Sequence, residues 1–165
     1  FKELYKKAYK HAIERLSTSV KAEDIMTKHV ISVKRHTPLI EVAELMAKHK
    51  ISGVPVVDEE DRVIGVISEK DFLKKMGSGE VSTFMEVLEK CLKTEGCVIA
   101  PIRAKDAGEL MSSPAITVKG DINVSHIAKL FSEKRINRVP VVDDKGRLIG
   151  IISRGDILKI PFIEV

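Results

Sequence analysis

The second half of this sequence repeats the first half at a spacing of 85 residues. The segment ISGVPVVDEEDRVIGVISEKDFL, residues 51–73, aligns without a gap on INRVPVVDDKGRLIGIISRGDIL, residues 136–158. The match extends upstream, where MTKHVISVK aligns on MSSPAITVK, and roughly 19 of the 50 positions in residues 24–73 are identical. Two copies are too few for a solenoid, so we expect two similar units packed about a pseudo-twofold axis.

Each copy predicts the order β-α-β-β-α, a small α/β unit. A short β segment at 31–33 or 116–118 leads into an amphipathic helix, for which the first copy predicts Thr37 as the N-cap and Pro38 as the first helical residue. Two β-branched runs follow, VPVVD and then VIGVIS or LIGIIS, and the short polar segment between them predicts a β-hairpin. The last helix begins at the serine that ends the second run.

The chain divides into four predicted segments: an N-terminal helix and linker at 1–19, the first repeat at 20–76, an inter-repeat linker with a helix at 77–104, and the second repeat at 105–165. We expect the two additional helices at 2–16 and 81–93, because apolar residues recur there at helical spacing. The part of each repeat that precedes its first strand, residues 20–30 and 105–115, is called its leading segment below.

The composition excludes several classes of function. No apolar run approaches the roughly 18 residues that span a bilayer. The net charge of +4 is spread without a run of like charges, which argues against direct nucleic-acid binding. Cys91 and Cys97 are too few for a disulfide framework, so we expect reduced thiols in a cytoplasmic protein. The histidines lack metal-ligand spacing, so no metal site is expected. We expect no enzyme activity either, because the sequence has no activated nucleophile, glycine-rich phosphate loop or paired catalytic carboxylates.

Each copy carries a Ser-x-x-Asp motif where a buried strand meets a helix, at Ser68 to Asp71 and at Ser153 to Asp156. Free backbone N–H groups at a helix start favour an anion such as phosphate. The aspartate can reach back to the N–H of the serine in a capping box. Its carboxylate can alternatively accept hydrogen bonds from a ribose diol, as acidic residues do in other nucleotide sites. The double occurrence of the motif favours ligand binding, but both interpretations stay open.

The linked motifs GVPVVD, VIGVISEKD, RVPVVD and LIGIISRGD, preceded by DIMT and ELMS, resemble the CBS domain family. The resemblance covers nearly all of residues 20–161. It implies a regulatory module that binds AMP, ADP, ATP or an S-adenosylmethionine-type compound in clefts between two paired repeats. It further implies a homodimer that acts on an attached or associated effector protein and requires no cofactor.

The resemblance implies two clefts, each of which combines the Ser-x-x-Asp motif of one repeat with the leading segment and first strand of the other. The cleft that we expect to bind better comprises Thr27, Val30, Ser32, Ile51, Ser52, Asn137, Arg138, Ser153, Arg154 and Asp156. The second cleft comprises Ser52, Gly53, Ser68, Lys70, Asp71, Ser112, Ala115, Thr117, Ile136 and Asn137. Two methionines at matching positions, Met26 and Met111, either pack in the core or line these clefts.

The two clefts differ where a phosphate would lie. The second repeat has Arg138 before its first long strand and Arg154 after its last, whereas the first repeat offers Lys70 alone. Arginine presents a planar set of donors suited to phosphate, so we expect the Asp156 cleft to prefer a phosphorylated ligand. The alternative is that both arginines form ordinary surface salt bridges. The alternative function is a CBS module that binds no ligand and serves dimerisation or docking.

Overall fold

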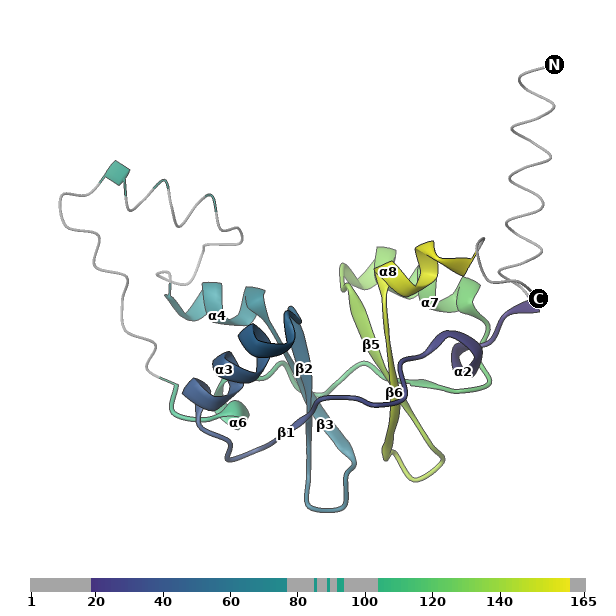
Figure 1. Cartoon of the computed structure of the whole chain (residues 1–165), viewed down its shortest axis with the longest axis horizontal. Helices are drawn as coiled ribbons and strands as arrows, with labels where there is room; N and C mark the ends of the chain where they lie inside the picture. The colour runs from purple at the N-terminus through teal and green to yellow at the C-terminus, as the bar shows by residue number, and fades with distance from the viewer. Residues whose placement is uncertain (1–18, 77–84, 86–88, 90–91, 94–103, 161–165) are drawn as a thin grey trace. The chain divides into compact units, whose positions relative to one another are not determined.

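The computed structural model describes residues 19–76, 85, 89, 92–93 and 104–160. The predicted helix at 2–16 and both cysteines lie outside these residues, and the described residues of the predicted helix at 81–93 are helical. No helix in the described part of the chain is long and apolar enough to cross a membrane. The elements are α2 (Ala22–Ile25), β1 (Val33–Lys34), α3 (Leu39–His49), β2 (Gly53–Val57), β3 (Val63–Ser68), α4 (Glu69–Met76), α6 (Ala107–Leu110), β4 (Val118–Lys119), α7 (Val124–Lys134), β5 (Arg138–Val142), β6 (Leu148–Ser153) and α8 (Arg154–Leu158) (Figure 1).

Each repeat forms a three-stranded sheet, which confirms the predicted α/β class and the β-α-β-β-α order. In the first sheet, β1 runs parallel to β2, and β2 pairs antiparallel with β3. The second sheet has the same pairing among β4, β5 and β6. A parallel pair requires a crossover connection, which α3 and α7 provide. The VPVV runs form the central strands β2 and β5, and all four residues of each run are buried.

The two sheets have separate hydrophobic cores with matching members. In each core, the apolar stripe of the crossover helix packs with the buried residues of the three strands. Phe131 of α7 occupies the position that Met46 holds in α3, so the second core has the larger side chain there. The buried residues of the first core are Val33, Leu39, Val42, Met46, Val54, Val56, Ile67, Ala107 and Leu110. Those of the second are Ala22, Val118, Ile127, Phe131, Val139, Val141 and Ile152.

The leading segment of each repeat packs on the sheet of the other repeat. Helix α2, from the first repeat, contributes Ala22 to the second core, and Thr27 forms a β-bridge with Ile151 of β6. Helix α6, from the second repeat, contributes Ala107 to the first core. The described residues therefore form two compact units, here called the first unit (31–76 and 104–115) and the second unit (19–30 and 116–160).

A methionine in each leading segment packs directly on a glycine of the sheet. A Cβ built at Gly150 of β6 would lie 2.8 Å from Cγ of Met26 and 3.0 Å from its Cβ. Gly65 of β3 has the same relation to Met111. A larger residue at either glycine must displace the methionine. Of the two roles predicted for Met26 and Met111, the structure therefore favours packing.

The predicted start of the first crossover helix is wrong by one residue. Pro38, expected as the first helical residue, is instead the N-cap of α3, with φ of −57° and ψ of 142°. Thr37, expected as the cap, accepts a hydrogen bond on Oγ1 from the backbone N–H of Lys34 (3.0 Å). The hydroxyl therefore closes the turn before the helix, a local bond that competes with capping.

Candidate functional site

A residue with left-handed backbone geometry ends each crossover helix and turns the chain toward predicted ligand residues. Lys50 after α3 and Arg135 after α7 both have φ of 52°. This conformation at a C-cap stops the helix and reverses the chain direction. Ser52 and Asn137 follow two positions later, where both are exposed. The turn thus places each of these polar residues directly before the central strand of its sheet, Ser52 before β2 and Asn137 before β5.

The motif of the second repeat forms a capping box at the start of α8. Asp156 accepts hydrogen bonds on Oδ2 from the backbone N–H of Ser153 (2.7 Å) and from its hydroxyl (2.8 Å). The other carboxylate oxygen, Oδ1, receives no hydrogen bond from the described residues. A carboxylate has about four acceptor positions on its two oxygens. Capping therefore uses one oxygen and leaves the other for an external donor, so the two interpretations of the motif are compatible.

The motif of the first repeat has the same core but one additional contact. Asp71 accepts on Oδ2 from the backbone N–H of Ser68 (2.7 Å) and from its hydroxyl (2.9 Å). Its second oxygen, Oδ1, accepts from the hydroxyl of Ser112 (3.1 Å), which belongs to the leading segment of the second repeat. Both oxygens of Asp71 are therefore engaged within the protein.

The backbone N–H groups at the two helix starts are partly used by protein acceptors. Glu69, the first residue of α4, donates its N–H to the carbonyl of Ser52 (3.1 Å), and Arg154 of α8 donates to the carbonyl of Asn137 (3.0 Å). The preceding N–H, that of the motif serine, is bound to the motif aspartate. Helix α8 has only five residues, which limits its dipole. These helix starts therefore offer few free N–H groups, and binding of a phosphate there would depend mainly on cationic side chains.

Each compact unit contains one Ser-x-x-Asp motif and part of the residues predicted for the same cleft. The second unit holds Thr27 and Val30 together with the motif of the second repeat, and the first unit holds Ser112 and Ala115 together with the motif of the first repeat. The remaining members belong to the opposite unit in each case, so their place at the site stays a prediction. These members are Ser32, Ile51 and Ser52 for the Asp156 cleft, and Thr117, Ile136 and Asn137 for the Asp71 cleft.

The sequence did not predict a cavity in the first unit. It has a volume of about 650 Å³ and is mostly apolar. Its signal in the sequence was a pair of small residues, Ala43 and Ala47, four positions apart on the exposed side of α3. The lining residues are Ala43, Met46, Ala47, Lys50, Ile51, Ser52, Glu69, Phe72 and Leu73.

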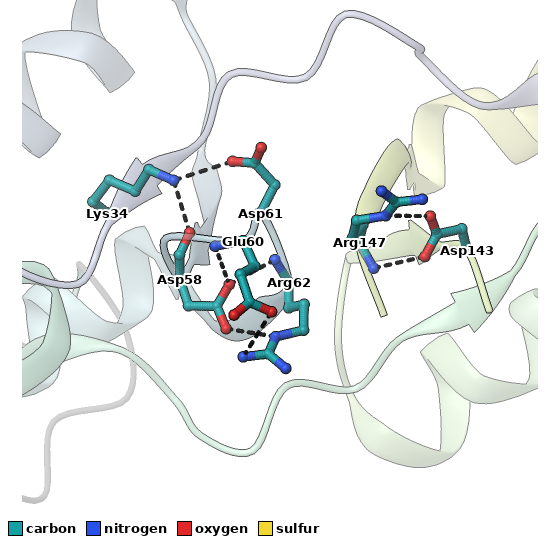
Figure 2. Close-up of polar contacts among 7 residues, drawn as sticks. All are labelled: Lys34, Asp58, Glu60, Asp61, Arg62, Asp143 and Arg147. Carbon is teal, nitrogen blue, oxygen red and sulfur yellow. Dashed lines mark hydrogen bonds and ion pairs between the residues drawn. The ribbon is translucent and has the colours of Figure 1, made fainter. Parts of the chain in front are cut away.

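An aspartate organises the β2–β3 turn (Figure 2). Asp58 accepts hydrogen bonds from the backbone N–H (2.9 Å) and Nε (2.8 Å) of Arg62 and from the N–H of Glu60 (3.0 Å). Lys34 Nζ donates to the carbonyl of Asp58 (2.7 Å) and pairs with Asp61 (3.1 Å). Partial burial acts to raise the pKa of Asp58, but the hydrogen bonds from Arg62 and Glu60 outweigh it and leave the pKa lowered. These charges are paired with one another and fasten β1 to the turn.

The β5–β6 turn repeats this arrangement around Asp143 (Figure 2). Arg147 donates its backbone N–H (2.9 Å) and Nε (2.8 Å) to Asp143, as Figure 2 shows. Lys145 also donates its backbone N–H to Asp143 (2.9 Å). The N–H of Arg147 is the main reason that the pKa of Asp143 is lowered; partial burial opposes it, and the Arg147 side chain adds to it. Lys119 Nζ binds the Asp143 carbonyl (2.7 Å), as Lys34 binds that of Asp58. Both turns are structural and carry no candidate site.

The short helix α6, which the sequence analysis missed, is fixed by a capping arrangement. Asp106 accepts a hydrogen bond from the N–H of Glu109 (3.1 Å), and Glu109 Oε2 accepts from the N–H of Lys105 (2.9 Å). Asp106 also pairs with Nδ1 of His36 (3.3 Å) from the other repeat. The N–H of Glu109 is the main cause of the lowered pKa of Asp106. The order Asp-x-x-Glu was the available signal for this helix start.

Comparison with protein families identifies the CBS domain at two regions, residues 22–78 and 107–162. These regions coincide with the two copies of the sequence repeat. The uncharacterized protein MJ1426 of Methanocaldococcus jannaschii is 32% identical over 83% of this chain and 88% of that protein. The chain spans 60 to 65% of the length of three further curated relatives.

Solved structures give the same family and add ligands. CBSX2 in complex with AMP is similar with a TM-score of 0.66 and 30% identity, covering 86% of this chain and 96% of that chain. The CBS domain pair of protein MJ0100, in complex with 5'-methylthioadenosine and S-adenosyl-L-methionine, has a TM-score of 0.67 and 27% identity, covering 87% and 96%.

Proposed function

This chain belongs to the CBS domain family, and on that premise we propose that it is a regulatory module that binds an adenine nucleotide or an adenosyl compound at the Asp156 motif. The observation that carries the proposal is the state of the Asp156 carboxylate. Its Oδ2 is held by Ser153, and its Oδ1 receives no hydrogen bond from the described residues. Similar domain pairs bind AMP, 5'-methylthioadenosine and S-adenosyl-L-methionine, which share the ribose that such an oxygen would accept.

Cationic side chains around the motif support a phosphorylated ligand. Arg154 directly follows the motif serine and is exposed, and Arg138 pairs with Ser153 in the β5–β6 register. A guanidinium donates two parallel hydrogen bonds to a phosphate, which a lysine cannot do. The Asp71 motif has the flexible Lys70 in this region and no arginine at the matching positions. We therefore assign AMP-like ligands to Asp156 in preference to Asp71.

Regulation would follow from linkage. A ligand shifts a conformational equilibrium only as far as its affinities for the two states differ. The predicted contacts Ser32, Ile51 and Ser52 belong to the other unit, so a ligand that also binds them favours one arrangement of the units. An attached or associated protein that responds to this arrangement would be the effector. The module itself has no catalytic role in this proposal, requires no cofactor and acts in the cytoplasm.

A second function, dimerisation or docking, is favoured by apolar groups on the helices. The side chain of Ile40 on α3 is 66% exposed and lies on the same helix as the two alanines that line the cavity. Leu158 at the end of α8 is 73% exposed. Burial of such groups against a second copy of the chain would remove apolar surface from water. A homodimer is therefore part of the proposal and does not depend on ligand binding.

A thermal-shift screen tests the proposed function. AMP, ADP, ATP, S-adenosylmethionine, methylthioadenosine and cyclic di-AMP are compared with adenosine. A ligand at 100 times its dissociation constant adds about 2.7 kcal/mol to the free energy of unfolding. We expect at least one compound to stabilise the protein, Asp156→Ala to reduce that stabilisation, and Arg138→Ala to weaken AMP binding more than adenosine binding. A lack of stabilisation by every compound would refute ligand sensing and leave the docking function.

A further inference from the structure

The hydroxyl of Ser112 occupies the oxygen of Asp71 that a ligand would need. The Ser112 backbone is fixed by two hydrogen bonds to Val66 of β3, from its N–H to the Val66 carbonyl (3.0 Å) and from the Val66 N–H to its own carbonyl (3.2 Å). The neighbouring Ser113 hydroxyl donates to the carbonyl of Ile64 (3.0 Å). Ser112 is therefore held where its hydroxyl reaches Asp71 Oδ1 at 3.1 Å.

The same backbone arrangement recurs at the other motif without this contact. Thr27 is the counterpart of Ser112 in the 85-residue repeat, and it exchanges two backbone hydrogen bonds with Ile151 (both 3.0 Å). Lys28 stands where the other leading segment has Ser113. Among the described residues, no side chain donates to Oδ1 of Asp156. The two motifs thus differ in one hydrogen bond on an otherwise repeated scaffold.

We propose that Ser112 is an internal competitor that lowers the affinity of the Asp71 motif, so that the Asp156 motif fills first. This inference rests on the proposed function, because it assigns the order in which the two motifs bind. The two capping bonds fill both acceptor positions of Oδ2, so a vicinal diol that donates two hydrogen bonds needs both acceptor positions of Oδ1, one of which Ser112 holds at Asp71. At Asp71 the diol must displace the Ser112 hydroxyl from a charged acceptor, whereas at Asp156 it meets an oxygen that no described group occupies.

Removal of the Ser112 hydroxyl should change the ligand affinity in opposite directions for a competitor and for a ligand contact. If Ser112 only contacted the ligand, its removal would weaken binding. If it competes, its removal leaves Asp71 Oδ1 open and strengthens binding. Loss of one hydrogen bond to a charged group corresponds to a change of about tenfold in the dissociation constant. Ser112 is exposed, so Ser112→Ala leaves the core intact.

Calorimetric titration with AMP tests the competition at each motif separately. The Asp71 motif is measured in an Asp156→Asn background with and without Ser112→Ala. We expect Ser112→Ala to tighten binding about tenfold, or to create binding where the background shows none. Two matched variants separate competition from a general loosening of the leading segment. Ser113→Ala, which removes only the bond to Ile64, and Thr27→Ala in an Asp71→Asn background should not tighten binding.

The outcomes distinguish this inference from the proposed function. If the Asp71→Asn protein binds AMP but Ser112→Ala leaves the Asp71 motif unchanged or weaker, the competition is refuted and the proposed function stands. Equal tightening by Ser113→Ala would also refute it, because Ser113 does not touch Asp71. If the Asp71→Asn protein binds none of the adenosyl compounds, the proposed function fails, and the inference that rests on it fails as well.

Discussion

Substitution of Gly150 by alanine tests whether the leading segment of one repeat packs on the sheet of the other. The new methyl group would lie 2.8 Å from Cγ of Met26 and 3.0 Å from its Cβ, and closer still to its sulfur. Because the conflict reaches back to the Met26 Cβ, rotation of the side-chain end alone does not relieve it. Overpacking of this kind costs about 1–3 kcal/mol. We expect Gly150→Ala to lower the free energy of unfolding by that amount.

Urea denaturation followed by circular dichroism measures the effect, with Gly155→Ala as the matched control. A Cβ at Gly155 of α8 meets only the Ser153 hydroxyl at 3.6 Å, an ordinary contact. Alanine is a better helix former than glycine, so Gly155→Ala should be neutral or stabilising by up to about 1 kcal/mol. Thermal midpoints should fall by roughly 2–4 °C for each kcal/mol lost at Gly150.

A double-mutant cycle with Met26→Ala identifies the contact. Met26→Ala removes the group that the new methyl would meet, so Gly150→Ala should cost less than about 0.5 kcal/mol in that background. The two substitutions should therefore couple by about 1 kcal/mol or more. If Gly150→Ala lowers the free energy of unfolding equally with and without the Met26 side chain, the leading segment of the first repeat does not pack on β6. The packing of this segment on the sheet of the other repeat would then be refuted.

Three further predictions concern stability. Asp143→Asn should make stability depend less on pH in acid. The lowered pKa of Asp143 stabilises the fold above the unfolded carboxyl pKa of about 3.9, and this stabilisation is lost as the pH falls through the folded pKa. The urea midpoint should therefore vary less between pH 7 and pH 3 in the variant than in the wild-type protein. Phe131→Ala, at a side chain only 3% exposed, should cost about 3–5 kcal/mol, whereas Ile40→Ala at 66% exposure should change stability by about 0.5 kcal/mol or less in urea titrations. Asp106→Ala should destabilise α6 by removing its N-cap, and amide hydrogen exchange at Glu109 in the first turn of α6 should become faster; equal exchange rates would contradict the cap.

The hydrophobic pattern was sufficient to predict most of each unit. The VPVV runs had to be buried central strands because every position is β-branched or proline, and the acidic turn between the two runs admits only a hairpin. The Ser-x-x-Asp motif was located correctly at a helix start, since a strand ending in serine places its hydroxyl at the N-cap. These features depend on residues close together in the chain.

The features that the sequence could not predict depend on contacts between distant residues. Helices α2 and α6 have four residues each, too short for a periodic pattern, and they owe their place to burial of Ala22 and Ala107 on the sheet of the other repeat. The bond from Ser112 to Asp71 joins residues 41 positions apart, and Thr27, a similar residue at the matching position, does not form it. No local pattern distinguishes these two cases.

Calorimetric titration of AMP into two single variants tests the central claim most directly, namely that the Asp156 carboxylate is the main acceptor for an adenosyl ligand. Asp156→Asn keeps the size of the side chain and removes its charge, and Asp71→Asn makes the same change at the matching motif. We predict that the wild-type protein binds AMP, that Asp71→Asn retains this binding, and that Asp156→Asn weakens it by about tenfold or more. Equal affinity of the wild-type and Asp156→Asn proteins would contradict the account.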